Sequence, residues 1–261
     1  MQLPFPFYQQ ATPAQQALFR QAIRIEKEKQ PASHRGIGTL QEKSLHRILK
    51  YYIEPITDLH EKPLGAYIAD IYNENGITEV QTGSFYPLRQ KLITFLPLCP
   101  VTLIHPLFYS KTLYRVDTVS GSVSAPRHSP LHAGVYDCAK EFFWIADLLT
   151  HENLTVRLLY LQGEEWQTEN GGTQNSRRCT RRILLQPTDL LGEQVLHGAD
   201  AFSALIPFAN TPFTVSALAT AIRRRRSCAR YLVYALERAG ILFSCGKDGR
   251  KKLYMLSQPP E

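Results

Sequence analysis

The turn at residues 73–76, Asn-Glu-Asn-Gly, joins two segments in which apolar and polar side chains alternate. Alternation with a period of two is typical of strands, and Asn and Gly favour the tight turns of hairpins. We therefore expect a β-hairpin at 67–82, with a helix before it at 39–53 and another after it at 85–95. The short apolar segment 101–105 then reads as a strand inside a sheet, reached by a crossover helix. This order predicts an α/β (α+β) unit.

The remaining segments add further elements to this unit. An amphipathic helix is expected at 12–29, followed by a connector rich in Pro, Ser and Gly at 30–38. Beyond the hairpin we expect a second hairpin at 112–125, a helix at 135–149, a buried strand at 155–161 and a polar, Gly-rich loop at 167–182.

One uncharged stretch has nearly the length of a membrane span. No charged residue occurs from Leu92 to Ser110, but Pro97, Pro100 and Pro106 interrupt it, and its second half is β-branched. We therefore expect no membrane segment. The five cysteines are widely spaced and no pair has metal-ligand spacing, which is typical of reduced thiols in a cytoplasmic protein.

The positive charge of the chain is concentrated near its C-terminus. The chain has a formal net charge of +7, yet the span 215–252 alone holds ten basic and two acidic residues, so it carries +8 and the rest carries −1. A basic module attached to a nearly neutral domain is typical of a protein that binds nucleic acid.

This basic span resembles a winged helix-turn-helix domain. A first helix is expected at 214–222 and a second at 228–239, capped by Ser227 and ended by Gly240, with two strands following at 241–245 and 252–256. The resemblance implies that the second helix enters the major groove of DNA. The residues expected to contact DNA are Arg223, Arg224, Arg225, Arg226, Ser227, Arg230, Tyr231, Tyr234, Lys247, Arg250 and Lys251.

A winged helix used for dimerisation is the alternative for this module. Four consecutive arginines repel one another unless an anion is near, which favours nucleic acid as the partner.

The hairpin carries two acids and an amide on one face. With Asn73 paired to Gly76, Asp70 lies opposite Glu79; with a turn at Asn75-Gly76, Asp70 lies opposite Gln81. In both registers the three side chains share a face. Opposed like charges destabilise a sheet, and a divalent cation between them would relieve the repulsion.

These residues resemble the core of the PD-(D/E)XK nucleases. Ala69-Asp70, followed by Glu79-Val80-Gln81, stands in the expected order of helix, hairpin, helix and strand. The chain is also similar to an uncharacterised bacterial family with such a core and an E-x-Q-T element. The resemblance implies hydrolysis of phosphodiesters with Mg²⁺ (or Mn²⁺) held by Asp70, Glu79 and the Val80 carbonyl. It also implies a further acid on the preceding helix, which Glu42 matches, and His46 lies one helical turn away from it.

The sequence departs from the nuclease pattern at two positions. Ala69 replaces the proline, and Gln81 replaces the lysine, whose charge an amide cannot supply. Lys91, on the helix after the motif, is close enough in sequence to reach back and provide that cation.

Three regions are therefore expected: an N-terminal helix and linker at 1–37, a PD-(D/E)XK-like domain at 38–200 with a central mixed sheet flanked by helices, and a winged helix at 201–261. The expected function is DNA binding coupled to metal-dependent phosphodiester cleavage, with DNA as partner and a homodimer left open. The alternative is a transcriptional regulator whose N-terminal domain is a catalytically inactive nuclease-like fold or an unrelated α/β domain.

Overall fold

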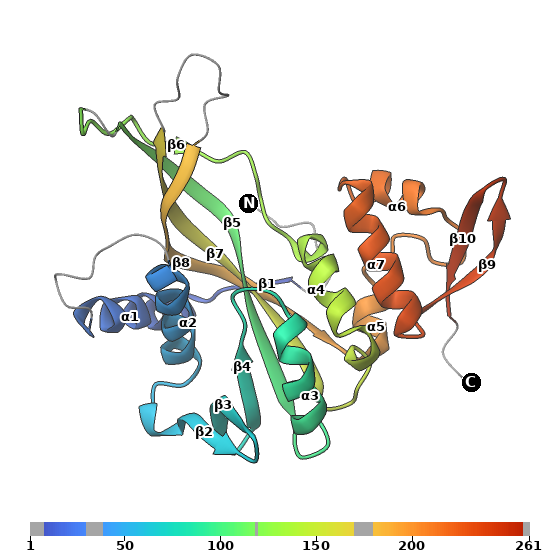
Figure 1. The fold of residues 1–261 in the computed structure, drawn as a ribbon, viewed down its shortest axis with the longest axis horizontal. Helices are drawn as coiled ribbons and strands as arrows, with labels where there is room; N and C mark the ends of the chain where they lie inside the picture. Colours follow the sequence, from blue (N-terminus) through green and yellow to red (C-terminus); the bar gives the residue numbers. More distant parts are fainter. Residues whose placement is uncertain (1–7, 30–38, 118–119, 170–179, 258–261) are drawn as a thin grey trace.

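The computed structural model places an eight-stranded mixed sheet at the centre of the molecule (Figure 1). It describes residues 8–29, 39–117, 120–169 and 180–257. The three central strands β4, β5 and β7 run parallel, and the strands on either side of them run antiparallel. In spatial order the strands are β1 (Tyr8–Gln10), β8 (Thr180–His197), β7 (Leu154–Glu169), β5 (Val101–Asp117), β4 (Gly76–Val80), β3 (Tyr67–Asn73) and β2 (His60–Leu64), with β6 (Arg127–His128) beside β5.

Helices cover both faces of this sheet. On one face, α1 (Pro13–Lys29) and α2 (Thr39–Ile53) bury Phe19 and Leu49 against Ile104 of the sheet. The guanidinium of Arg47 on α2 holds the carboxylate of Glu26 on α1, with Nε 2.9 Å from Oε2. α1 therefore forms one layer with α2, and β1, just before α1, adds a strand to the sheet.

The opposite face carries the helices that follow the hairpin. They are short, and 3₁₀ turns flank several of them: η3 (Tyr86–Leu88) leads into α3 (Arg89–Phe95), and η4 (Val135–Cys138), α4 (Ala139–Trp144) and η5 (Ala146–Leu148) follow one another. One more 3₁₀ turn, η2 (Thr57–Leu59), precedes β2, and α5 (Gly198–Ser203) follows β8.

The expected hairpin, its flanking helices and the mixed sheet are confirmed. The hairpin turn needs glycine, because Gly76 has φ of +103° and a Cβ there would lie 2.3 Å from the carbonyl oxygen of Pro100. The structure corrects several boundaries. The helix expected at 135–149 is broken into η4, α4 and η5. The second hairpin expected at 112–125 is confirmed in part, because the end of β5 forms its first arm and an antiparallel bridge joins Val116 to Val123 in the second arm.

The loop expected at 167–182 is shorter than predicted, because strands extend into both of its ends. β7 extends to Glu169 and β8 begins at Thr180, and the residues between them lie outside the described part of the chain. Within the described residues, no helix is both long enough and apolar enough to cross a membrane.

The C-terminal unit consists of two helices, α6 (Val215–Ala221) and α7 (Arg226–Arg238), followed by a hairpin of β9 (Leu242–Asp248) and β10 (Lys251–Leu256). Phe213 forms an isolated antiparallel β-bridge with Tyr254 of β10, beside the hairpin. The expected cap at Ser227 is wrong, because α7 begins two residues earlier than expected, with Arg225 at the N-cap position. Gly240, with φ of +75°, ends α7 in the left-handed conformation as expected.

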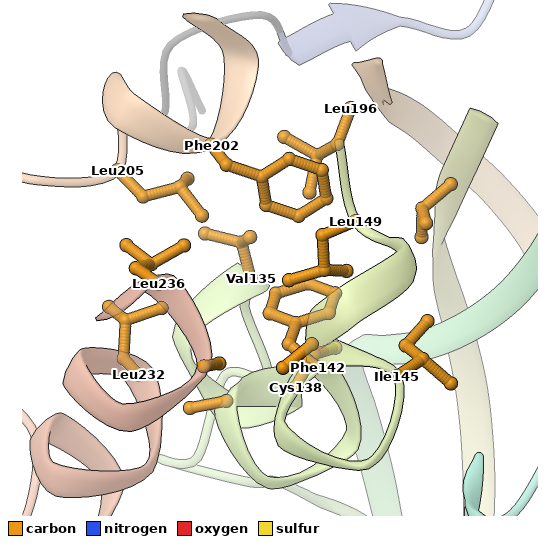
Figure 2. Packing of buried hydrophobic residues seen from close by; sticks show 14 of the residues in the cluster. Val135, Cys138, Phe142, Ile145, Leu149, Leu196, Phe202, Leu205, Leu232 and Leu236 are labelled. Atoms are coloured by element: carbon orange, nitrogen blue, oxygen red, sulfur yellow. The ribbon is translucent and has the colours of Figure 1, made fainter. Parts of the chain in front are cut away.

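A single hydrophobic core joins this unit to the sheet. Leu232 and Leu236 of α7 are fully buried and belong to the same cluster as Phe142 of α4 and Phe202 of α5. Figure 2 shows these side chains converging between the helices. The shared core fixes the C-terminal unit on the second face of the sheet, so the two units form one body.

We predict that the chain unfolds in one cooperative transition that includes both units. Leu236→Ala should lower the free energy of unfolding by about 2–5 kcal/mol, because it removes a buried side chain from the shared core. Differential scanning calorimetry should show one peak, shifted as a whole. Ser227→Ala, at an exposed position of the same helix, should shift it little. Two separate peaks, with only one of them shifted, would contradict the shared core.

Candidate functional site

The backbone pairing between β3 and β4 ends just before the two acids, Asp70 and Glu79. Ile71 and Thr78 are the last pair in register, which corresponds to the first of the two expected registers and places Asp70 across from Glu79. Beyond this pair, side chains take over the backbone hydrogen bonds. The N–H of Val80 donates to Oδ2 of Asp70 at 2.8 Å, and the N–H of Asp70 donates to Oε1 of Glu79 at 3.3 Å. Both carboxylates therefore lie in the gap between the strands.

A basic group from each helical layer meets one of these carboxylates. Nε2 of His46, on α2, lies 3.1 Å from Oδ2 of Asp70, and Nζ of Lys91, on α3, lies 2.6 Å from Oε2 of Glu79. The expected reach of Lys91 into the site is confirmed. His46, Asp70, Glu79 and Lys91 thus form a continuous chain of polar contacts through the gap in the sheet.

The two acids have opposite shifts in pKa. Burial, followed by the negative charge of Asp70, raises the pKa of Glu79 to about 7, and Lys91 only partly offsets this. Burial alone would also raise the pKa of Asp70. The hydrogen bond and charge of His46, together with the Val80 N–H, outweigh burial and bring it below its ordinary value. Around pH 7 the pair therefore holds a carboxylate at Asp70 and a titrating group at Glu79.

The other predicted residues of the site, Gln81 and Glu42, are not among the groups seen to meet in the gap. The side-chain amide of Gln81 donates to the carbonyl of Ser84 and so holds the turn after β4. The side chain of Glu42 lies outside the described residues, although its backbone belongs to α2. Among the side chains that the structure describes, no group of three or more His, Cys, Asp or Glu is arranged to hold a metal ion.

One histidine that the sequence analysis did not single out supports the end of β4. Nδ1 of His105 lies 2.5 Å from the carbonyl oxygen of Gln81, while the N–H of Gln81 donates to Ile104. In a parallel ladder, the next donor to Gln81 would be the N–H of residue 106, which is Pro106 and has none. The histidine ring supplies that missing hydrogen bond. Burial lowers the pKa of His105, which favours the neutral ring. The signal in the sequence is a histidine directly before a proline in a strand.

The predicted DNA contacts of the C-terminal unit divide into a group that faces away from the sheet unit and a group that contacts it. Arg226, Arg230, Tyr234, Arg250 and Lys251 line a shared pocket, together with Lys252 and Tyr254, which the sequence analysis had not named as contacts. Of the other predicted contact residues, Arg223, Arg225, Ser227 and Lys247 are exposed outside this lining.

The second group faces the sheet unit. Arg224 forms a bidentate contact with the carboxylate of Asp137 in η4, at 3.1 Å for each nitrogen. The ring of Tyr231 packs edge-on against Phe143 of α4, with 5.6 Å between ring centroids. Arg224 and Tyr231 therefore hold the two units together, and we exclude them from the candidate DNA contacts. The sequence could not separate them from their neighbours, because their partners are distant along the chain.

We predict that the free energy of unfolding depends on pH between about 4.5 and 7 because of Glu79. The folded protein binds this proton more tightly than the unfolded chain does, so the stabilisation is present below pH 4.5 and is lost as pH rises through about 7. Glu79→Gln keeps an uncharged group there. Relative to this variant, the wild type should lose about 3 kcal/mol of unfolding free energy across that window.

Urea unfolding of both proteins at several pH values measures this difference. The lowered pKa of Asp70 acts in another window, since its stabilisation is lost only as pH falls below 3.8. Glu74→Gln removes an exposed acid from the same hairpin and serves as the matched control. If the difference in unfolding free energy between wild type and Glu79→Gln stays constant with pH, burial does not destabilise the charged form of Glu79, and the prediction is wrong.

Comparison with known proteins places the chain in a family. A model for the Domain of unknown function (DUF8091) matches residues 43–197, which span α2 to β8 and include His46, Asp70, Glu79 and Lys91. A protein of Treponema pallidum (strain Nichols), described as an uncharacterized protein, is 30% identical over 232 residues, covering 86% of this chain and 88% of its own. No solved structure matches. The chain belongs to the DUF8091 family.

Proposed function

We propose that the chain is a metal-dependent phosphodiesterase of the PD-(D/E)XK type that cuts DNA. The observation that carries the proposal is the meeting of Asp70, Glu79 and Lys91 where β3 and β4 separate. Two carboxylates and a lysine in one gap are the groups that this reaction uses, and the lysine comes from α3 in place of Gln81. The carboxylates are held by the sheet itself, which suits a site that must keep a fixed geometry.

The donors in the gap fit Mg²⁺. It binds oxygen ligands and commonly takes only one or two carboxylates from a protein, with water and phosphate oxygens completing the shell. Asp70 and Glu79 supply two such groups, and none of the described residues makes a hydrogen bond to Oδ1 of Asp70. The raised pKa of Glu79 reflects, after burial, repulsion from Asp70, which a cation between the two carboxylates would relieve. Asp70, Glu79 and the Val80 carbonyl are the proposed ligands.

Each residue of the site then has a chemical role. When bound, Mg²⁺ lowers the pKa of a water molecule and neutralises charge that builds up on the phosphate. Lys91 provides the fixed positive charge that stabilises the phosphate oxygens. His46 holds Asp70 in position through Nε2, and Glu79 must lose its proton to act as a ligand, so activity should rise with pH through about 7.

The C-terminal unit is the proposed DNA-binding module, a winged helix in which α7 is the recognition helix and the hairpin of β9 and β10 is the wing. Arg226, Ser227, Arg230 and Tyr234 are exposed or partly exposed along one side of α7. Lys247 lies on β9, and Arg250, in the turn before β10, lines the same pocket as Arg226 and Arg230. Lysines and arginines there would neutralise phosphates and release counterions, which supplies most affinity for DNA of any sequence.

A second function has one observation in its favour. Both carboxylates are already paired, with His46 and Lys91, and such contacts also suit a nuclease-like fold that binds DNA without cutting it. Such a protein would serve as a DNA-binding regulator, and the cleavage experiment separates the two functions.

The proposal predicts Mg²⁺- or Mn²⁺-dependent cleavage of DNA that requires both acids. Asp70→Asn and Glu79→Gln should each lower the rate by at least about 100-fold, because either change removes a metal ligand. Lys91→Ala should lower it while leaving metal affinity in place. Gel analysis of a labelled duplex measures cutting, and the same samples in EDTA measure binding, which all three variants should retain.

Glu74→Gln is the control, because it removes an acid from the same hairpin at an exposed position. Binding without cutting in the wild type, unchanged by Asp70→Asn, would overturn the catalytic assignment and favour the regulator.

A further inference from the structure

The C-terminal unit contains a concave site between its helices and its hairpin. The site has a volume of about 240 Å³. It is lined by residues from the start of α6, from α7, and from β10 and the turn before it. Five of the lining residues are cations and none is an acid. The cations are Arg226, Arg230, Arg250, Lys251 and Lys252.

These cations differ from Arg224 and Arg238 of the same unit, which have acidic partners. Arg224 pairs with Asp137, and Arg238 lies 3.7 Å from Asp147, so the side facing the sheet unit is neutralised. Among the described residues, none of the five pocket cations forms an ion pair or a side-chain hydrogen bond. Asp248 stands opposite Lys251 in the hairpin register but makes no ion pair with it. The pocket therefore concentrates positive charge that the protein leaves uncompensated.

We propose that this pocket binds a phosphate monoester, the group at the end of a phosphorylated DNA strand or on a free nucleotide. The inference deepens the proposed function, because it names the feature of DNA that the C-terminal unit selects. The binding itself needs no catalysis, so it can be tested independently of the carboxylate site.

The charge in the pocket favours a monoester over the diesters of the DNA backbone. A phosphate monoester carries about −1.5 to −2 near neutral pH, whereas each diester carries −1. Coulomb attraction to a fixed set of cations grows in proportion to that charge. Arginine adds paired donors that match phosphate oxygens, and the pocket has three arginines.

The size and the aromatic lining of the pocket also suit this ligand. About 240 Å³ is below the ~300–1,000 Å³ of typical small-molecule sites, so it fits one phosphate with its attached sugar better than a length of duplex. The ring of Tyr234 is 44% exposed at the edge of the pocket, where a terminal base could stack on it. A strand end thus meets both a charged site and a stacking surface.

The test compares matched DNA ends in EDTA, where no cutting occurs. Full-length protein is titrated into a labelled short duplex that carries either 5′-phosphates or 5′-hydroxyls, and fluorescence anisotropy gives the affinity. The phosphorylated duplex should bind at least about tenfold more tightly. Arg230→Ala combined with Lys251→Ala should remove this preference. Arg223→Ala, an exposed arginine outside the pocket, should weaken binding of both duplexes equally and keep the preference.

Competition identifies the source of the phosphate. If a deoxynucleoside 5′-monophosphate displaces the phosphorylated duplex at a similar concentration, the ligand is a free nucleotide; if only the phosphorylated strand competes well, it is a DNA end. Calorimetric titration of the same monophosphate tests the pocket even if the duplex binds weakly. Equal affinity for both duplexes with no heat from the monophosphate would overturn the proposal. An equal loss of affinity for both duplexes in the Arg230→Ala, Lys251→Ala variant would also overturn the proposal.

Discussion

Two carboxylates in the gap between β3 and β4 replace the backbone ladder of the hairpin. Asp70 accepts the N–H of Val80 and Glu79 accepts the N–H of Asp70, so the strands can separate without leaving those donors unpaired. Each acid then recruits a basic group from one helical layer, His46 from α2 and Lys91 from α3. The same contacts that let the sheet open therefore tie both layers to it. The remaining strain is electrostatic, and burial beside Asp70 leaves Glu79 with a pKa of about 7.

The second constraint is the absence of a boundary in the core between the sheet and the C-terminal unit. Leu232 and Leu236 pack into the cluster that contains Phe142 (Figure 2). The side chains of Arg224 and Asp137 form a further contact between the two units. A DNA-binding module connected by a flexible linker would let its catalytic partner act over a range of distances. Here the two surfaces are held at one separation. In the proposed nuclease, the bound end or site would therefore fix the place of the cut.

The sequence predicted local elements better than their tertiary partners. The alternating pattern and the Asn-Gly turn predicted the hairpin, but both registers satisfied them, and only the observed pairing of Ile71 with Thr78 distinguishes them. The reach of Lys91 to Glu79 was expected from its place on the helix after the motif, and the structure confirms it. The break of the helix at 135–149 did not follow, because 3₁₀ and α turns bury similar patterns of side chains. Arg224 and Arg226 have the same side chain and lie two residues apart, so the sequence could not tell them apart. Only the contact of Arg224 with the distant Asp137 shows that Arg224 is structural, whereas Arg226 is exposed.

The central claim is that Asp70 and Glu79 share a divalent cation in the gap of the hairpin. Calorimetric titration of Mn²⁺ into the full chain, at a pH above 7 where Glu79 is ionised, tests this without requiring any substrate. We expect about one ion bound per chain, loss of that binding in Asp70→Asn, and retention of it in Lys91→Ala. Binding that is absent in the wild type, or unchanged by Asp70→Asn, would contradict it.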